Sequence, residues 1–349
     1  MKKMPAAALR ERLQGALIPA VPAPFDAAGA PHPAAEARLA RYHAAGPAAG
    51  VALWVHTGRG LRLESGLRRE VFRRWRAALR PEQFIIAGVG LPEARAEPAG
   101  SLGGAIEAAV GMAEEAREAG ADGLLVHPPT WLRGGAGAEP AMIAYHEALG
   151  GVGPPLILFY LYEAAGGVSY DLGLLERLLR LPNVAGIKVA TLDSIMTFQD
   201  IARLIEARAP EVALLTGEDR FFGATLMRGA VGALIGLAAV RPGPQAELID
   251  CARRGRWGRF VPLSRGIDRL AESIFIAPME GYIRRLMLAL AVEGVLPMEA
   301  TYDPWGPEVG EGALGPIREA LRQLERLEGD EFAGWGRRPR RRQGARRRG

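Results

Sequence analysis

Short apolar runs recur along this chain, and longer segments of mixed polarity separate them. Each run is rich in β-branched or other apolar residues without polar alternation, which is typical of a strand buried on both faces. Eight such runs are present, at residues 17–21, 50–55, 84–89, 123–127, 156–160, 184–189, 212–216 and 232–237.

The segments between the runs carry a helical pattern. Apolar residues recur there at positions i, i+3, i+4 and i+7, the stripe of a helix that lies on a sheet. Strands that alternate with such helices indicate right-handed βαβ units. Eight units predict an α/β fold, a closed (β/α)₈ TIM barrel, and the clearest helical segments are 67–80, 105–119, 171–180, 194–208 and 219–228.

Further helical segments follow the eighth run, at 244–254, 258–275, 280–293 and 314–328. A plain barrel does not need them, so they predict a C-terminal helical subdomain. We therefore divide the chain into an N-terminal arm (1–14), the barrel (15–240), the helical subdomain (241–330) and a disordered tail (331–349).

Composition narrows the cellular setting. The chain has 349 residues, of which 49% are hydrophobic, enough for a large core. No stretch of about 18 apolar residues is free of charge, so no membrane span is expected. The single cysteine, Cys251, excludes an intrachain disulfide framework, and a reducing cytoplasm is the expected location.

The net charge of +5 comes from one end of the chain. Residues 337–349 hold eight arginines and no acid, and the remainder of the chain is mildly acidic. Such a tail could bind nucleic acid or anionic lipid. No aromatic residue lies between these arginines to stack on bases. We therefore expect a solvated, disordered tail and no nucleic-acid partner.

One lysine lies inside an apolar run. Lys188 follows Ile187 and precedes Val189, and burial in a barrel would lower its pKa. A neutral amine can attack a carbonyl and form a Schiff base. Tyr160 ends the preceding run and could shuttle protons at the same mouth. The alternatives are a lysine paired with a carboxylate and a tyrosine of the core.

Several motifs together resemble the pyruvate-dependent class I aldolases, the superfamily of dihydrodipicolinate synthase and N-acetylneuraminate lyase. The resemblance spans roughly residues 15–297, and this chain looks like a divergent member. The matching segments are LIPAVPAPFDAAGAP (17–31), VHTGRGLRL (55–63), LILFY (156–160), GIKVA (186–190), LLTGEDRFF (214–222) and GAVGALIGLAA (229–239).

The resemblance implies roles for individual residues. Lys188 would form the imine with a 2-oxo acid such as pyruvate, and Tyr160 would relay protons. Thr57 would bind the substrate carboxylate, and Gly58 would let the backbone approach closely. Leu234 falls where the family places a backbone carbonyl near the substrate. The chemistry needs no cofactor beyond this imine and no metal, and the five histidines show no metal-binding pattern.

The loop 55–63 departs from the family pattern. His56 replaces a threonine of the family's relay and could itself perform acid–base work. Arg59 replaces a glutamate and could clamp a second carboxylate, or lie on the surface. The family's arginine for its aldehyde substrate aligns with Ala165, which argues against dihydrodipicolinate synthesis itself. Thr130 lies near the position of the tyrosine that relatives contribute across a dimer.

The resemblance leaves several activities open. A lyase that cleaves or condenses a 2-oxo acid is favoured, for example on a 2-oxo-3-deoxy acid. A 2-oxo acid dehydratase and a non-catalytic 2-oxo acid-binding relative are the alternatives. Relatives are commonly tetramers, so a homo-oligomer, either a dimer or a tetramer, is expected.

Overall fold

The computed structural model describes residues 4–93, 101–133, 137–192 and 194–335. In this part of the chain eight parallel strands form one sheet in the order β1-β8-β7-β6-β5-β4-β3-β2. A parallel bridge between Ala20 and Ala52 joins the two edges and closes the barrel. The strands are β1 (Leu17–Pro19), β2 (Gly50–Leu53), β3 (Phe84–Gly90), β4 (Gly123–His127), β5 (Leu156–Leu161), β6 (Val184–Ala190), β7 (Ala213–Thr216) and β8 (Gly232–Ile235). The predicted TIM barrel is confirmed.

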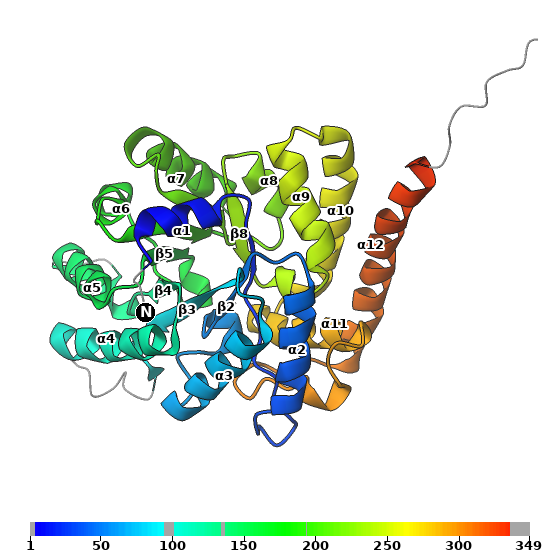
Figure 1. Cartoon of the computed structure of the whole chain (residues 1–349), viewed down its shortest axis with the longest axis horizontal. Coiled ribbons are helices and arrows are strands. Elements are labelled where there is room, and N and C mark those ends of the chain that lie inside the picture. Colours follow the sequence, from blue (N-terminus) through cyan, green and yellow to red (C-terminus); the bar gives the residue numbers. More distant parts are fainter. Residues whose placement is uncertain (1–3, 94–100, 134–136, 193, 336–349) are drawn as a thin grey trace, which may run out of the picture.

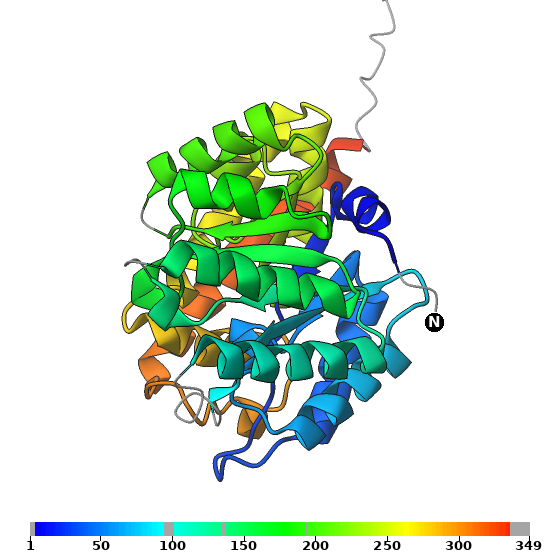
Figure 2. The ribbon, with the colours of Figure 1, turned by 90° about the vertical axis from the view of Figure 1, so that its left-hand side faces the viewer.

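Helices surround the strands on the outside (Figures 1 and 2). Most begin at a side-chain cap: the carboxylate of Asp171, for example, accepts a hydrogen bond from Leu174 N and starts α6. The surrounding helices are α2 (Pro33–Ala45), α3 (Ser65–Ala78), α4 (Leu102–Ala119), α5 (Ala138–Val152), α6 (Leu172–Leu179), α7 (Ile195–Arg208) and α8 (Phe222–Leu226).

The apolar side chains of each strand separate into two layers. One set fills the barrel interior, and the alternate set packs between the strands and the helices. This alternation follows from the period of two along a strand. It decides which side chains of β5 and β6 can reach the mouth of the barrel.

The N-terminal segment is not a free arm. Helix α1 (Ala6–Leu13) packs against β6 and β7, and its Leu9 and Leu13 are fully buried in the interior cluster. The apolar face of α1 thus closes the end of the barrel opposite the strands' carboxyl ends. This segment belongs to the core of the barrel.

The C-terminal subdomain lies on one side of the barrel (Figure 1). It consists of α9 (Pro242–Arg253), α10 (Trp257–Ile274), α11 (Tyr282–Val292) and α12 (Leu314–Trp335). Helix α10 packs on α9 and α12, and the start of α11 approaches the mouth of the barrel. Helix α12 occupies the first five residues of the predicted tail; the rest, from residue 336, lies outside the described residues.

Candidate active site

A small cavity at the carboxyl ends of the strands surrounds Lys188. Lys188 projects from β6 into the barrel interior and is 7% exposed. The cavity measures about 60 Å³, and we call it the inner chamber. Its polar lining includes His56, Thr57, Lys188, Glu218, Asp219 and Tyr282.

Burial sets the ionisation of Lys188. It lowers the pKa of the amine to about 8, although Asp219 and Glu218 favour the charged form. Burial also raises the pKa of each of these carboxyls to about 7. Asp219 accepts a hydrogen bond from Leu237 N at 2.7 Å. Glu218 accepts one from Thr191 Oγ1 at 2.9 Å, so both carboxyls are held in place.

The lysine side chain fits because residue 217 is glycine. A Cβ at Gly217 would lie 2.8 Å from Lys188 Cε, and 3.0 Å from both Ala190 Cβ and the Val189 carbonyl oxygen. Real Cβ atoms essentially never approach another atom to less than 3.0 Å. The Lys188 conformation therefore depends on a glycine at the end of β7.

Strand register places Phe159, and not Tyr160, beside Lys188. Phe159 pairs with Lys188 across β5 and β6, and the lysine Nζ lies 4.5 Å from the centre of its ring. Tyr160 points into the outer layer, where its ring meets Tyr170 edge-on at 6.0 Å. The prediction that Tyr160 works at the mouth beside Lys188 is therefore wrong about its position. The phenylalanine offers no hydroxyl there.

A tyrosine from the C-terminal subdomain supplies a hydroxyl instead. The oxygen of Tyr282 is 3.0 Å from Thr57 Oγ1 and 3.0 Å from His56 Nδ1. Thr57 and His56 lie in a short 3₁₀ turn, His56–Gly58, directly after β2. The second ring nitrogen of His56, Nε2, is 3.4 Å from Glu280 Oε1. The loop and the subdomain thus meet at the inner chamber.

Arg59 is occupied by acids of its own chain. It makes a bidentate contact with Asp303, Nη2 to Oδ2 at 2.8 Å and Nε to Oδ1 at 3.3 Å. Its Nη1 donates to Glu280 Oε2 at 2.8 Å. Burial disfavours the charge, but the two carboxylates outweigh it and raise the pKa of Arg59. The structure contradicts the prediction that Arg59 clamps a substrate carboxylate, because the guanidinium already joins the loop to the C-terminal subdomain.

Two further predicted residues lie beside the site without lining it. A Cβ at Gly58 would lie 2.9 Å from the Val21 carbonyl oxygen, so this glycine packs the loop against the end of β1. Leu234 is fully buried in the interior cluster. Neither lines the cavities at the mouth. The backbone role that the resemblance implies for Leu234 stays a prediction.

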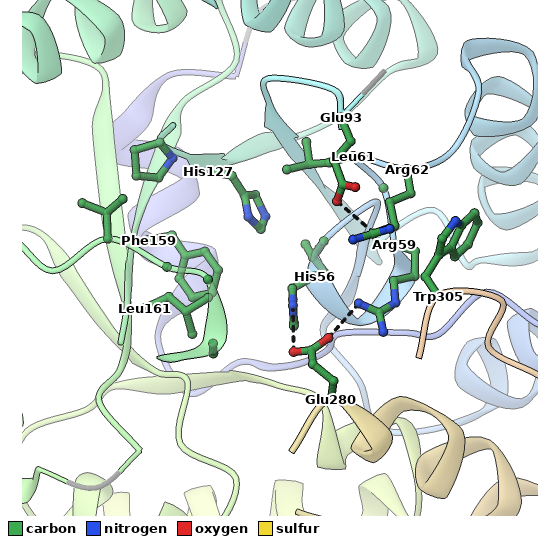
Figure 3. A pocket seen from close by; sticks show the side chains of 17 residues that line it. His56, Arg59, Leu61, Arg62, Glu93, His127, Phe159, Leu161, Glu280 and Trp305 are labelled. Carbon is green, nitrogen blue, oxygen red and sulfur yellow. Dashed lines mark hydrogen bonds and ion pairs between the residues drawn. The ribbon is translucent and has the colours of Figure 1, made fainter. Parts of the chain in front are cut away.

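A larger cavity of about 380 Å³ adjoins the inner chamber (Figure 3). The two share several lining residues, among them His56, Phe159 and Glu280. His127, at the end of β4, points into this outer cavity (Figure 3), and its buried Nε2 has no hydrogen-bond partner among the described residues. Burial, with repulsion from His56 and Lys188, lowers the pKa of His127 to about 3. A neutral imidazole therefore faces any molecule bound in the outer cavity.

Metal binding and membrane insertion were both predicted to be absent. No group of His, Cys, Asp and Glu side chains there is arranged to hold a metal ion. No helix in the same residues is long and apolar enough to cross a lipid bilayer. The arginines of 337–349 lie outside the described residues. The cytoplasmic location and the homo-oligomer stay predictions.

Sequence reasoning gave no role to several residues of this site. Tyr282 and Glu280 come from a segment predicted only as a helix of the subdomain, and no pattern connects it to the loop after β2. Gly217 and Asp219 follow a predicted strand, which was a usable signal, because strand ends in a barrel meet at one mouth. Phe159 was named only as part of a motif.

The fold and the buried lysine define a (β/α)₈ barrel protein with its polar site at the carboxyl ends of the strands. The model of the dihydrodipicolinate synthetase family matches residues 13–312, and the chain belongs to this family. Its relatives in sequence carry two kinds of name, 4-hydroxy-tetrahydrodipicolinate synthase and uncharacterized DapA-like lyase.

Individual relatives are distant. The 4-hydroxy-tetrahydrodipicolinate synthase of Synechococcus sp. (strain CC9605) is 30% identical over 264 residues, covering 75% of this chain and 80% of the relative. The sialic acid aldolase structure of Ruminococcus gnavus has a TM-score of 0.75 at 20% identity, covering 91% and 99% of the two chains. The dihydrodipicolinate synthase structure of Agrobacterium tumefaciens str. C58 has a TM-score of 0.74 at 21% identity, covering 90% and 99%. The two structures establish the fold alone.

Proposed function

We propose that this protein is a lyase that forms a Schiff base between Lys188 and a 2-oxo acid. The observation that carries the proposal is the burial of Lys188 at the mouth of the barrel, with a pKa of about 8. Relative to the ordinary value of 10.5, this shift increases the neutral fraction at pH 7 roughly 300-fold. The neutral amine is the nucleophile of imine formation.

Thr57 supports a 2-oxo acid as the substrate. Thr57 lines the inner chamber together with Lys188, and its hydroxyl can donate a hydrogen bond to the carboxylate of the 2-oxo acid. The C2 carbonyl would then lie toward Nζ. The chamber of about 60 Å³ suits the small 2-oxo acid end. The outer cavity, lined by His56 and His127, would hold the remainder of a longer substrate.

The protonated imine would draw electrons from the adjoining bonds. In the cleavage direction the C3–C4 bond breaks, its electron pair moves toward the imine nitrogen, and the hydroxyl proton at C4 is removed. An aldehyde leaves and an enamine remains on Lys188. The enamine takes up a proton at C3, and water then releases pyruvate from the resulting imine. Condensation is the reverse, and dehydration would instead remove a proton from C3 and expel the hydroxyl of C4 as water.

The reaction is tested by pyruvate release from a panel of 2-oxo-3-deoxy acids, measured with coupled lactate dehydrogenase. We expect release from at least one of them and its loss in Lys188→Ala. Loss of water without release of pyruvate would identify a dehydratase. An alanine variant with full turnover would overturn the proposal.

A further inference from the structure

Four side chains form a continuous line from the inner chamber to the outer cavity. Thr57 Oγ1 and Tyr282 Oη are 3.0 Å apart, and Tyr282 Oη and His56 Nδ1 are also 3.0 Å apart. His56 Nε2 then lies 3.4 Å from Glu280 Oε1. All three contacts join the loop after β2 to the C-terminal subdomain.

The tyrosine is held rigidly within this line. Its ring stacks on Phe275, with centroids 4.9 Å apart and planes at 21°. It also stacks on His56, at 6.0 Å and 20°. Tyr282 is 8% exposed and lines the chamber that Lys188 lines. Its hydroxyl contacts Thr57 and His56, which line the same chamber, so the tyrosine adjoins the space where a carbonyl bound near Nζ would lie.

The other end of the line reaches solvent. The side chain of His56 is 27% exposed and that of Glu280 is 40% exposed. Both line the outer cavity (Figure 3). Arg59 holds Glu280 in place through the contact of 2.8 Å. An imidazole between a buried hydroxyl and an exposed carboxylate can take a proton at one nitrogen and release one at the other.

We propose that Tyr282 and His56 carry the protons of imine formation at Lys188, Tyr282 as the catalytic acid and His56 as its link to solvent. The assignment rests on the proposed function. It replaces Tyr160, which faces away, and Phe159, which has no hydroxyl. All groups of this relay come from a single chain, so the relay needs no residue from a second subunit.

Imine formation at Lys188 requires a defined set of proton transfers, which Tyr282 and His56 would carry. The neutral amine of Lys188 bonds to C2 of the 2-oxo acid, and the carbonyl π pair moves to its oxygen. That oxygen must receive two protons to leave as water. One comes from Nζ and one from solvent, and a protonated imine remains. Tyr282 donates to the oxygen, His56 Nδ1 returns a proton to Tyr282, and Nε2 accepts one from the outer cavity.

The pKa shifts of His56 and Tyr282 are consistent with proton transfer between them. Burial, together with Arg59 and Lys188, lowers the pKa of His56 to about 4 against the pull of Glu280. Burial also raises the pKa of the Tyr282 hydroxyl. Both groups are therefore neutral at pH 7 and can pass a proton without trapping a charge.

The test measures imine formation with pyruvate in full-length Tyr282→Phe, using cyanoborohydride and intact mass. The substitution keeps the ring that stacks on Phe275 and removes only the hydroxyl. We expect the rate of adduct formation to fall about 10²-fold to 10⁴-fold, the range for loss of a general acid, with the pyruvate concentration that gives half the maximal rate nearly unchanged. The final adduct on Lys188 should still form. Tyr160→Phe is the matched control, and its rate should equal that of the wild type.

A second variant tests the histidine by chemical rescue. His56→Ala opens space toward the outer cavity, and we expect added imidazole to restore a large part of its lost rate. A structural role for His56 would give no such rescue. Wild-type rates in Tyr282→Phe, or a His56→Ala rate that imidazole does not raise, would overturn the relay while leaving the Lys188 adduct intact. A wild-type protein that forms no adduct would refute the proposed function and the relay with it.

Discussion

Substituting Gly217 with alanine probes the Lys188 conformation directly. The new Cβ would lie 2.8 Å from Lys188 Cε, with Ala190 Cβ and the Val189 carbonyl oxygen each at 3.0 Å on other sides. The optimum separation of carbon atoms is about 3.5–4.0 Å, so one group must move by more than about half an ångström. The strand atoms are fixed by the sheet, whereas the lysine can rotate. The amine is therefore the group that moves.

The substitution should change both the free energy of unfolding and the reaction rate of Lys188, and two separate measurements distinguish these effects. Overpacking of this kind costs about 1–3 kcal/mol, which urea unfolding measures. Misplacing a reacting group by about 1 Å can cost about 10²-fold in rate, so the rate of cyanoborohydride trapping with pyruvate should fall by about that factor. Gly111→Ala in α4, whose added Cβ meets no atom within 4 Å, is the control and should trap at the wild-type rate. A folded Gly217→Ala protein that forms the pyruvate adduct as fast as the wild type would refute the position of Lys188 in the structure.

Three further predictions follow from the site. Tyr160→Phe should retain kcat and KM in a pyruvate-release assay, because its hydroxyl lies in the outer layer; a large loss would place it in the site. Arg59→Met should lower the free energy of unfolding by about 3–5 kcal/mol, because it leaves Asp303 buried and unpaired; Arg62→Met at the exposed rim should cost about 0–1 kcal/mol in the same urea titration. The trapping rate at Lys188 should rise with pH through about 8, as the ammonium loses its proton, and a rise near 10.5 would contradict its burial.

The eight strands could be predicted because each is buried on both faces and reads as a continuous apolar run. The predicted 123–127 coincides with β4, and the other strands shift by only a few residues at their ends. The sequence also placed Lys188 correctly inside β6. Local apolar patterns determine these features, so no long-range information was needed.

The side-chain direction on β5 could not be predicted in the same way. The β5–β6 pairing shifts register between Leu156 and Ile157, and a shift of one residue moves every side chain to the opposite face. The segments LILFY and GIKVA matched the family pattern, yet they carry no information about this irregularity. Phe159 therefore took the interior position that the resemblance assigned to Tyr160.

The contacts of the loop after β2 depend on residues far along the chain. Arg59 meets Asp303, and His56 meets Tyr282, across more than 200 positions. The sequence gives no sign that Arg59 is paired, because the two carboxylates that bind it, Glu280 and Asp303, belong to the C-terminal subdomain. Only the packing of α11 and the segment after it against the mouth reveals that Arg59 is occupied and that Tyr282 is present.

Reductive trapping tests the central claim most directly. The full-length protein is incubated with pyruvate and sodium borohydride, and the product is examined by intact mass and peptide mapping. We predict a single reduced pyruvate adduct, on Lys188, and none in Lys188→Ala. No adduct with pyruvate or any longer 2-oxo acid, or an adduct at another lysine, would contradict the Schiff-base account.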